Sequence, residues 1–312
     1  MNKMKKIGLT ALAASLVSVS ANAVDISGGA SISYNGGNGG LNGNPWSMND
    51  NLTFTWGGEM DNGMTVNMNF LLDSGDSVVG AGIDNRSLAL GLNGGGTLTF
   101  WGDGGSGVVG SFDDMMPTAY EESWYSADSP NQGHSPNNMF YYTNALDAAT
   151  IHASFSPRGN GEDASSMEIG AVITAIDNLE IGVAIGEDAA SASAEVDNTI
   201  MYAKYTMGAA TIGVQSNEAD SATVNADEEF MAYGISYAVS EDMSVSYGVS
   251  EIKYEAAADQ EATGFSASYT MGSMTLAGTL NNIKNEGAAS TGAGNTNKAE
   301  SDTFELNLSF AF

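Results

Sequence analysis

The chain has 312 residues, of which 38 are Asp or Glu and nine are Lys or Arg, so its formal net charge is −29. Phosphate backbones repel so acidic a surface, which argues against nucleic-acid binding. The absence of Cys excludes disulfide scaffolds, thiolate metal sites and cysteine nucleophiles. A hydrophobic content of 42% is too high for a disordered acidic chain.

The first residues have the composition of a secretory signal. Three lysines precede an apolar run from Ile7 to Val19, and Ala21 and Ala23 place small residues where a signal peptidase reads them. We therefore expect 1–23 to be a signal peptide and 24–312 to be the exported protein. An uncleaved membrane anchor is less favoured, because the apolar run is too short.

Beyond the signal, apolar residues alternate with small or polar ones. Successive side chains of a strand point to opposite faces, so each such segment has one apolar and one polar face. The pattern predicts about sixteen strands, the first at 24–34 and the last at 304–312. Among the others are 51–60, 210–215 and 274–280.

Short and long connections between these segments alternate strictly along the chain. Asp61-Asn62-Gly63 and Gly272-Ser273 are short and suit tight hairpins. Tight turns at one end and long loops at the other are typical of a membrane barrel, which must close because lipid leaves no backbone group unpaired. We therefore predict an all-β fold: a 16-stranded antiparallel transmembrane β-barrel with short periplasmic turns, long extracellular loops and a wet lumen.

The positions of the aromatic residues favour lipid around the barrel. They are expected in two bands, the first near the short turns and the second near the long loops, as interfacial girdles require. The residues are Trp56, Tyr205, Tyr237 and Phe312 in the first band, and Tyr34, Phe70 and Trp101 in the second. A secreted β-sandwich or solenoid is the alternative, since it would bury the same apolar faces against a second sheet.

Three local features are specific enough to suggest a family. Asn85–Leu92 and Gly96–Phe100 are adjacent strand-like segments, and the long loop 103–137 is third in order. The chain ends on alternating large residues, Phe304, Leu306, Leu308, Phe310 and Phe312. Together they resemble Gram-negative general porins, closest in style to the short alphaproteobacterial trimeric porins. The resemblance implies the outer membrane, a homotrimer, and recognition of the chain ending by the barrel assembly machinery.

In porins of this kind the third loop folds inward to narrow the pore. Here the loop contains no Lys or Arg, and its acids would form a negative constriction that selects ions by the sign of their charge. These acids are Asp103, Asp113, Asp114, Glu121, Glu122 and Asp128. The alternative is an exposed, solvated loop.

The resemblance also implies basic residues on the wall that faces the loop. Arg86 matches one such arginine, although its parity with Leu88 points it at lipid unless a bulge intervenes. The fifth strand, which often ends in Gly-Arg in the family, here ends in Gly102-Asp103. An acid thus replaces a basic residue at this position, which favours the passage of cations. Other candidates for the pore wall are Lys204, Glu168, Glu180 and His152.

The predicted function is passive diffusion of cations and small hydrophilic solutes through a porin. One alternative is a substrate-selective channel for a sugar or other small nutrient, with an aromatic stacking slide that could begin at Trp101, Tyr120, Trp124 and Tyr125. A second alternative is a secreted β-rich binding protein or adhesin without a pore.

We expect no enzyme, catalytic residue, metal site or tightly bound cofactor. Gly105–Gly110 matches G-x-G-x-x-G, but Pro117 argues against the helix that a dinucleotide site needs. His134 and His152 are the two histidines, too few for a zinc enzyme. Acidic loops could bind Ca²⁺ or Mg²⁺ weakly and bridge to lipopolysaccharide phosphates; they are 73–76, 161–163, 187–188 and 228–229.

Overall fold

The computed structural model describes residues 24–37, 44–73, 82–124, 138–158, 165–188, 195–286 and 300–312. The expected signal peptide, 1–23, lies outside the described residues. The described residues form strands β1 (Asp25–Gly37), β2 (Trp46–Glu59), β3 (Thr65–Asp73), β4 (Gly82–Gly91), β5 (Thr97–Asp103), β6 (Met139–Ala145), β7 (Ala149–Ser156), β8 (Ser166–Ile176), β9 (Leu179–Asp188), β10 (Val196–Met207), β11 (Ala210–Ser221), β12 (Glu228–Ala238), β13 (Met243–Tyr254), β14 (Gln260–Met271), β15 (Met274–Lys284) and β16 (Glu300–Ala311).

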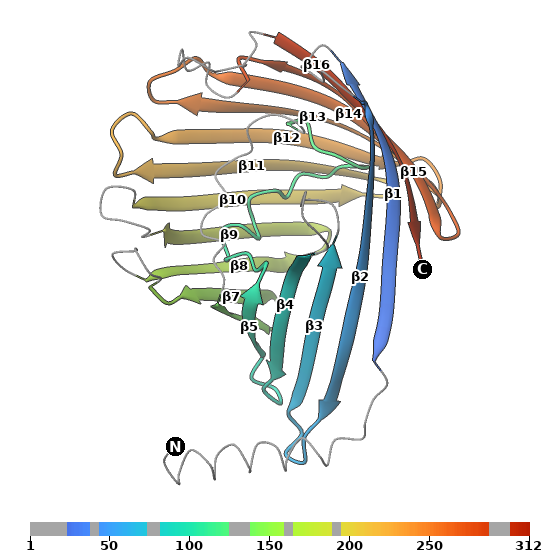
Figure 1. Ribbon diagram of the computed structural model, residues 1–312. Coiled ribbons are helices and arrows are strands. Elements are labelled where there is room, and N and C mark those ends of the chain that lie inside the picture. Colours follow the sequence, from blue (N-terminus) through green and yellow to red (C-terminus); the bar gives the residue numbers. More distant parts are fainter. Residues whose placement is uncertain are drawn as a thin grey trace.

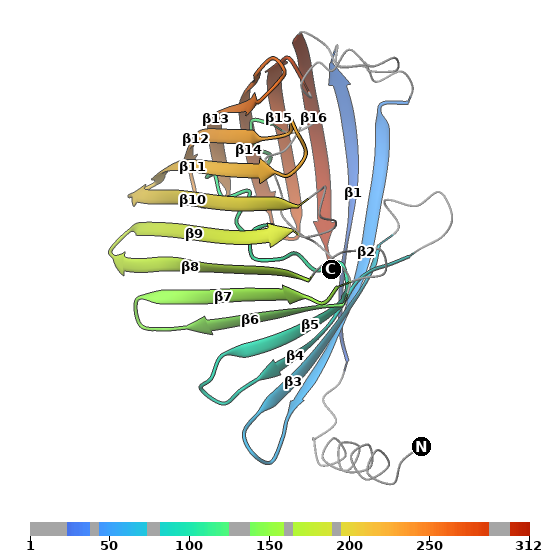
Figure 2. The same cartoon turned by 90° about the vertical axis from the view of Figure 1, so that its left-hand side faces the viewer.

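Each strand pairs antiparallel with the next, and β1 pairs with β16, so the sheet is a closed barrel (Figures 1 and 2). The closing seam ends in a pair of main-chain hydrogen bonds between Gly28 and Phe312, at 2.8 and 2.9 Å. Closure leaves no sheet edge, as lipid requires. The predicted 16-stranded antiparallel barrel is confirmed. Within the described residues, no helix is long and apolar enough to cross a membrane.

The short connections follow the turn chemistry that their residues predict. Gly63, Gly208 and Gly272 have φ values of +79°, +61° and +64°. A side chain rarely tolerates this left-handed backbone, and glycine adopts it without steric cost. These glycines therefore reverse the chain within a few residues at one end of the barrel.

Several strands extend further toward the long loops than the alternation predicts. β2 begins at Trp46, and β11 and β15 end at Ser221 and Lys284. In β2 the apolar period continues through Trp46 and Met48, which are exposed on the outer face. In the extensions of β11 and β15 the outer face loses its apolar period because a strand outside the lipid layer needs no apolar face. Cross-strand charge pairs replace it there: Lys284 lies opposite Glu261, with Nζ and Oε2 2.7 Å apart.

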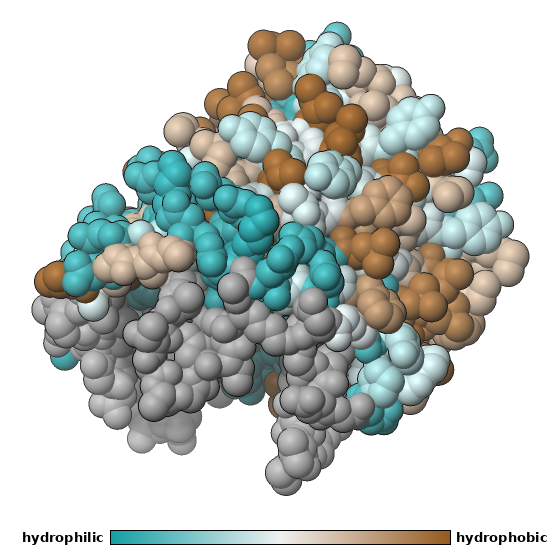
Figure 3. Space-filling model, turned by 90° about the horizontal axis from the view of Figure 1, so that it is seen from above, coloured by the Kyte–Doolittle hydropathy of each residue, from teal (hydrophilic) through white to brown (hydrophobic). Residues whose placement is uncertain are grey.

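The outer wall exposes large apolar side chains on the face opposite the polar residues. Ile169, Ile185, Tyr233, Phe265 and Leu280 are among the exposed residues. Figure 3 shows such side chains, brown or pale, over a broad area beside a strongly hydrophilic region. A wall of this composition suits hydrocarbon.

One expected band of aromatic residues lies on this outer wall at the short-turn end. Trp56, Tyr205 and Tyr237 are exposed there. Trp101 does not join the second band: it pairs with Ser87, and a Cβ on Gly105 would stand 2.5 Å from its ring. A bulge between β4 and β5, at Arg86 and Ser87, accompanies this inward placement.

Arginine at Ile235 tests which side of the wall faces lipid. Ile235 is exposed on the outer face of β12, and its neighbour Ser236 points inward. We expect Ile235→Arg to lower the free energy of unfolding in lipid vesicles by about 2 kcal/mol, because the charge enters hydrocarbon. The matched variant Ser236→Arg should cost less, as measured by urea unfolding followed by heat-modifiable mobility. Equal costs would contradict the assignment of faces.

Candidate functional site: a loop inside the barrel

The segment between β5 and β6 crosses the interior of the barrel. Its described part, residues 104–124, is called loop 3 here. Figure 1 shows it as a green trace inside the ring of strands. Its main chain bonds to side chains on the inner faces of β7, β8, β11, β13, β14 and β15. Beyond its first residues, where the Gly104 carbonyl accepts a hydrogen bond from Asn85 of β4, the loop therefore lies along one side of the lumen, away from β1–β3.

Loop 3 first touches the wall through two consecutive amides. The Val108 N–H donates to Ser154 Oγ at 3.1 Å, and the Val109 N–H donates to Glu168 Oε2 at 3.0 Å. Ser154 also donates to Glu168, at 2.9 Å. Glu168 is 3% exposed. This predicted pore-wall acid therefore holds the loop and does not face passing solutes.

Apolar packing fixes the same part of the loop. Val108 and Val109 are fully buried, and Phe112 packs with them against inner-face residues of β9 and β10. The rings of Phe112 and Tyr202 meet edge to face at 5.9 Å. Apolar burial of this kind stabilises a contact in proportion to the area removed from water.

Gln215 on β11 holds the middle of loop 3. Its Oε1 accepts from the Met115 N–H at 2.8 Å, and its Nε2 donates to the carbonyl of Asp113. Asn217 donates to the same carbonyl at 3.3 Å. Gln215 is fully buried, so losing these partners would leave polar groups unsatisfied away from water.

The second half of loop 3 rests on β13, β14 and β15. The Ala119 N–H donates to Ser246 Oγ, and Ser266 Oγ donates to the carbonyl of Glu121, both at 2.8 Å. Asn281 Nδ2 donates to the carbonyl of Glu122 at 2.8 Å. The main chain of the acidic pair is thus fixed by neutral side chains.

Trp124 closes the described part of the loop as an apolar anchor. It is 6% exposed and meets Phe230 edge to face at 5.0 Å. Met116, Ile252 and Ile283 belong to the same buried cluster. The Trp124 ring therefore has no free face on which a sugar could stack, so Trp124 does not contribute to the suggested aromatic slide. Tyr125 lies outside the described residues.

A row of glycines on the inner wall makes space for loop 3. Gly213, Gly234, Gly248 and Gly264 lie directly opposite one another across β11–β14. A Cβ on Gly213 would stand 2.5 Å from Pro117, and a Cβ on Gly264 would stand 2.6 Å from Ser123 Cα. Only glycine permits so close an approach of two backbones.

Four carboxylates of loop 3 lie inside the barrel. Asp113 is buried and Asp114 has an accessible side chain, while Glu121 and Glu122 occupy the second half of the loop. A fifth acid, Glu305 on β16, accepts a hydrogen bond from the Tyr120 hydroxyl at 3.2 Å. The predicted acid Asp103 ends β5, and Asp128 lies outside the described residues.

Burial, together with the charge of neighbouring acids, raises the pKa of Asp113, Asp114 and Glu121. Burial, followed by the charge of Glu122, raises the pKa of Asp113 to about 7. Burial also raises the pKa of Glu121 to about 7, and Glu122 and Glu305 add to the effect. The surrounding protein excludes water from Asp114 and so raises its pKa; the charge of Glu122 and a hydrogen bond with it raise the pKa further. Like charges in a confined site retain protons more strongly than they would in water.

Lys204 is the basic residue on the inner face of the described strands. Its Nζ lies 2.9 Å from Glu180 Oε1, and the Tyr202 hydroxyl donates to the same oxygen at 3.1 Å. Lys204 and Glu180 therefore both lie on the inner wall, and their ion pair offsets the charge of each. His152 also points inward, where it contacts Phe112 and bonds through Nδ1 to the Tyr141 hydroxyl at 2.9 Å.

Arg86 does not lie on the pore wall. It pairs directly with Phe70, and Leu88, which shares its face, is exposed on the outer surface. The expected bulge exists, but it adds Gly102 to β5 and leaves the alternation of β4 between Arg86 and Leu88 intact. Arg86 lies over Gly102, whose Cβ would stand 2.9 Å from Arg86 Nε. The pore-wall prediction for Arg86 disagrees with this geometry.

The wall residues that hold loop 3 were not predicted from the sequence. One signal was available, because a lumen-facing position is normally polar. Ile200, Phe230, Ile252 and Ile283 break that rule on the inner face, and all four are buried. Apolar residues and paired glycines on a wet face indicate that another segment covers it.

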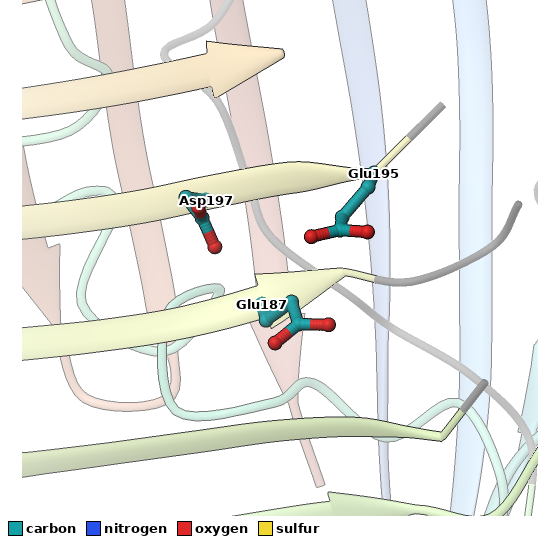
Figure 4. Close-up of side chains that lie close together, drawn as sticks. All are labelled: Glu187, Glu195 and Asp197. Carbon is teal, nitrogen blue, oxygen red and sulfur yellow. The ribbon is translucent and has the colours of Figure 1, made fainter. Parts of the chain in front are cut away.

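One acidic group lies at the long-loop end of β9 and β10. The carboxylate oxygens of Glu187, Glu195 and Asp197 lie within 4.8 Å of one another (Figure 4). Glu187 belongs to one of the acidic loops that the sequence suggested as weak binding sites for divalent cations. Glu229, from another of those loops, pairs with Lys253 at 3.7 Å. Weak binding of Ca²⁺ or Mg²⁺ stays a prediction.

A closed sixteen-stranded barrel with an inward loop defines a pore-forming outer-membrane architecture. A family model described as Gram-negative porin matches residues 8–288. The chain belongs to the Gram-negative porin family. Porins are passive channels, so the protein is not an enzyme. No curated protein matches the sequence significantly.

Solved porin structures share the fold at low sequence identity. A triple mutant of the Rhodopseudomonas blastica porin has a TM-score of 0.69 at 16% identity, over 93% of this chain and all of that one. An anion-selective porin from Comamonas acidovorans has a TM-score of 0.69 at 14% identity, over 93% of this chain and 99% of that one. These similarities establish the fold.

Valine at Gly264 tests the glycine row. The substitution places methyl groups where Ser123 lies, so loop 3 must move into the lumen. We expect a cost of about 1–3 kcal/mol in unfolding free energy and a lower single-channel conductance. Gly82→Val is the control, because a Cβ there meets no atom within 4 Å. An unchanged conductance in Gly264→Val would show that the loop rests elsewhere.

Proposed function

We propose that this porin is a cation-preferring diffusion channel for ions and small hydrophilic solutes. One observation most strongly supports the preference for cations over anions. Asp113, Asp114, Glu121 and Glu122 lie on a loop inside a barrel whose described inner face carries one basic residue, Lys204, already paired with Glu180. Charged groups at a constriction select ions by sign.

The other basic residues of the described strands lie away from the lumen. Arg86 shares the outer face of Leu88. Lys253 and Lys284 lie at the long-loop ends of β13 and β15, where each pairs with a glutamate on the adjacent strand. Apart from the paired Lys204, no basic residue of the described strands therefore faces the acids of loop 3, which supports a negative potential in the lumen.

The fold does not determine the sign of the selectivity. The Comamonas acidovorans porin has the same fold and is described as anion-selective. Side-chain charge decides the preference in such pores, and the charges described above favour cations in this chain.

The surroundings of the channel form the second part of the proposal. The family and the apolar outer wall support an outer-membrane location. We propose a homotrimer in contact with lipopolysaccharide, folded by the barrel assembly machinery, which would read the alternating residues of β16. Phe310 and Phe312 are exposed on the outer face, where such recognition requires them.

Neutral replacements in loop 3 test the proposed selectivity. The variant Asp113→Asn, Asp114→Asn, Glu121→Gln and Glu122→Gln removes charge and keeps side-chain size. We expect its cation-to-anion permeability ratio, measured as reversal potential in a KCl gradient, to fall toward one. Glu218→Gln and Asp220→Asn, at the long-loop end of β11, should leave the ratio unchanged. Anion preference in the unmodified protein would refute the proposal.

The raised pKa values predict that selectivity depends on pH. Asp113 and Glu121 titrate near pH 7, so they are largely neutral at pH 5 and ionised at pH 9. Cation preference should therefore increase across this interval, and the quadruple variant should lose most of that increase. Reversal potentials measured from pH 5 to pH 9 check both statements, and a flat profile in the unmodified protein would contradict them.

A further inference from the structure

The two sides of the lumen differ in whether their polar side chains are already bonded. On the loop side, Gln215, Asn217 and Asn281 all donate hydrogen bonds to the main chain of loop 3. These three residues are buried. They are therefore unavailable to a solute.

The opposite side carries a comparable set of polar groups, most of which stay open; Ser33 is the buried member and accepts a hydrogen bond from Asn307 Nδ2 at 2.7 Å. The amide wall is defined here as Ser31 and Ser33 on β1, Asn49 and Asn51 on β2, and Asn67 and Asn69 on β3. Alternation places them opposite to the outward residues Ile32, Met48 and Leu52. Ser31 pairs directly with Asn49, so the wall is continuous across the strands.

Three amides of this wall face open space. Asn49, Asn51 and Asn67 are exposed, and in the described part of the chain their side chains form no hydrogen bond with protein. A cavity of about 510 Å³ adjoins Asn67 at the short-turn end. The oxygen Asn69 Oδ1 in the same wall also accepts no hydrogen bond from the described residues, but it is buried and out of a solute's reach. The exposed amides of Asn49, Asn51 and Asn67 therefore offer the donors and acceptors that a passing solute can reach.

The amide wall is uncharged. Acids occur at its two ends, with Asp25 and Glu59 near the short turns and Asp73 near the long loops, and the inner faces of β1–β3 between them are neutral. Those inner faces carry no Lys or Arg to oppose the acids of loop 3. A dipolar solute would therefore meet charge on one side and hydrogen-bonding groups on the other.

The geometry points to a specificity role for the amide wall: it recognises uncharged, hydroxyl-rich solutes, such as sugars and polyols, by transient hydrogen bonds. An amide carries two donors and an acceptor, which match the hydroxyl groups of such solutes. Neutral groups are also cheaper to strip of water than charged ones. Asn49, Asn51 and Asn67 are the residues we assign. The inference rests on the proposed channel function and adds a class of solute to it.

Replacing the three amides with leucine tests this assignment. The triple variant Asn49→Leu, Asn51→Leu and Asn67→Leu keeps the branched shape of the side chain and removes hydrogen bonding. In proteoliposomes, we expect D-glucose uptake relative to KCl conductance to fall about two- to tenfold, the range for one net hydrogen bond. The ratio corrects for variants that insert poorly.

The triple variant with glutamine at the same positions is the matched control. Glutamine is longer than leucine and keeps the amide, so narrowing of the lumen by a longer side chain would slow glucose in the glutamine variant as well. We expect that variant to keep the original ratio. An unchanged ratio in the leucine variant, or an equal fall in both variants, would overturn the assignment. Failure of the channel proposal would appear separately, as anion preference or absent KCl conductance in the unmodified protein.

Discussion

The structure depends on the pairing of β1 with β16. An unpaired backbone group in hydrocarbon costs several kcal/mol, and the hydrogen bonds between Gly28 and Phe312 complete a ladder that removes both edges of the sheet. Closure also replaces other sources of rigidity, because the chain has no disulfide and no helix in the described residues. A ring of this size leaves a lumen that side chains alone do not fill. The lumen gives loop 3 a surface on which to pack.

Loop 3 divides the lumen into two unlike sides. Its main chain is held by neutral groups such as Gln215 and Asn281, and apolar anchors at Val109 and Trp124 fix its two halves. Asp114, Glu121 and Glu122 are therefore left beside the remaining space, while Asp113 is buried. Burial, followed by the charge of Glu122, raises the pKa values of Asp113 and Glu121. The same packing buries the polar wall behind the loop and leaves the wall of β1–β3 open. Sign selectivity and hydrogen bonding to solutes are thus assigned to opposite sides of one pore.

The barrel was predictable from sequence because lipid imposes a strict period of two and the turns carry their own glycine chemistry. Strand ends beyond the lipid were not predictable, since Lys284 and Ser221 lie where that period is no longer required. The acids of loop 3 were found as a charge pattern, but their anchors were not, because residues such as Gln215 are more than 90 positions away along the chain. Arg86 shows the limit of resemblance: its parity with Leu88 was the better guide to its position than the matching motif.

Selectivity depends on the position of loop 3 on the β7–β16 side of the lumen, and one cross-link tests that position directly. Ser123 of the loop and Ser250 of β13 have their Oγ atoms 3.2 Å apart. The chain has no native Cys, so Ser123→Cys with Ser250→Cys creates a single possible disulfide. We expect this bond to form under mild oxidation, Ser123→Cys with Ser33→Cys to stay reduced, and conductance to persist after cross-linking. A disulfide to position 33 but not to position 250, or a channel closed by the 123–250 bond, would contradict this placement of loop 3.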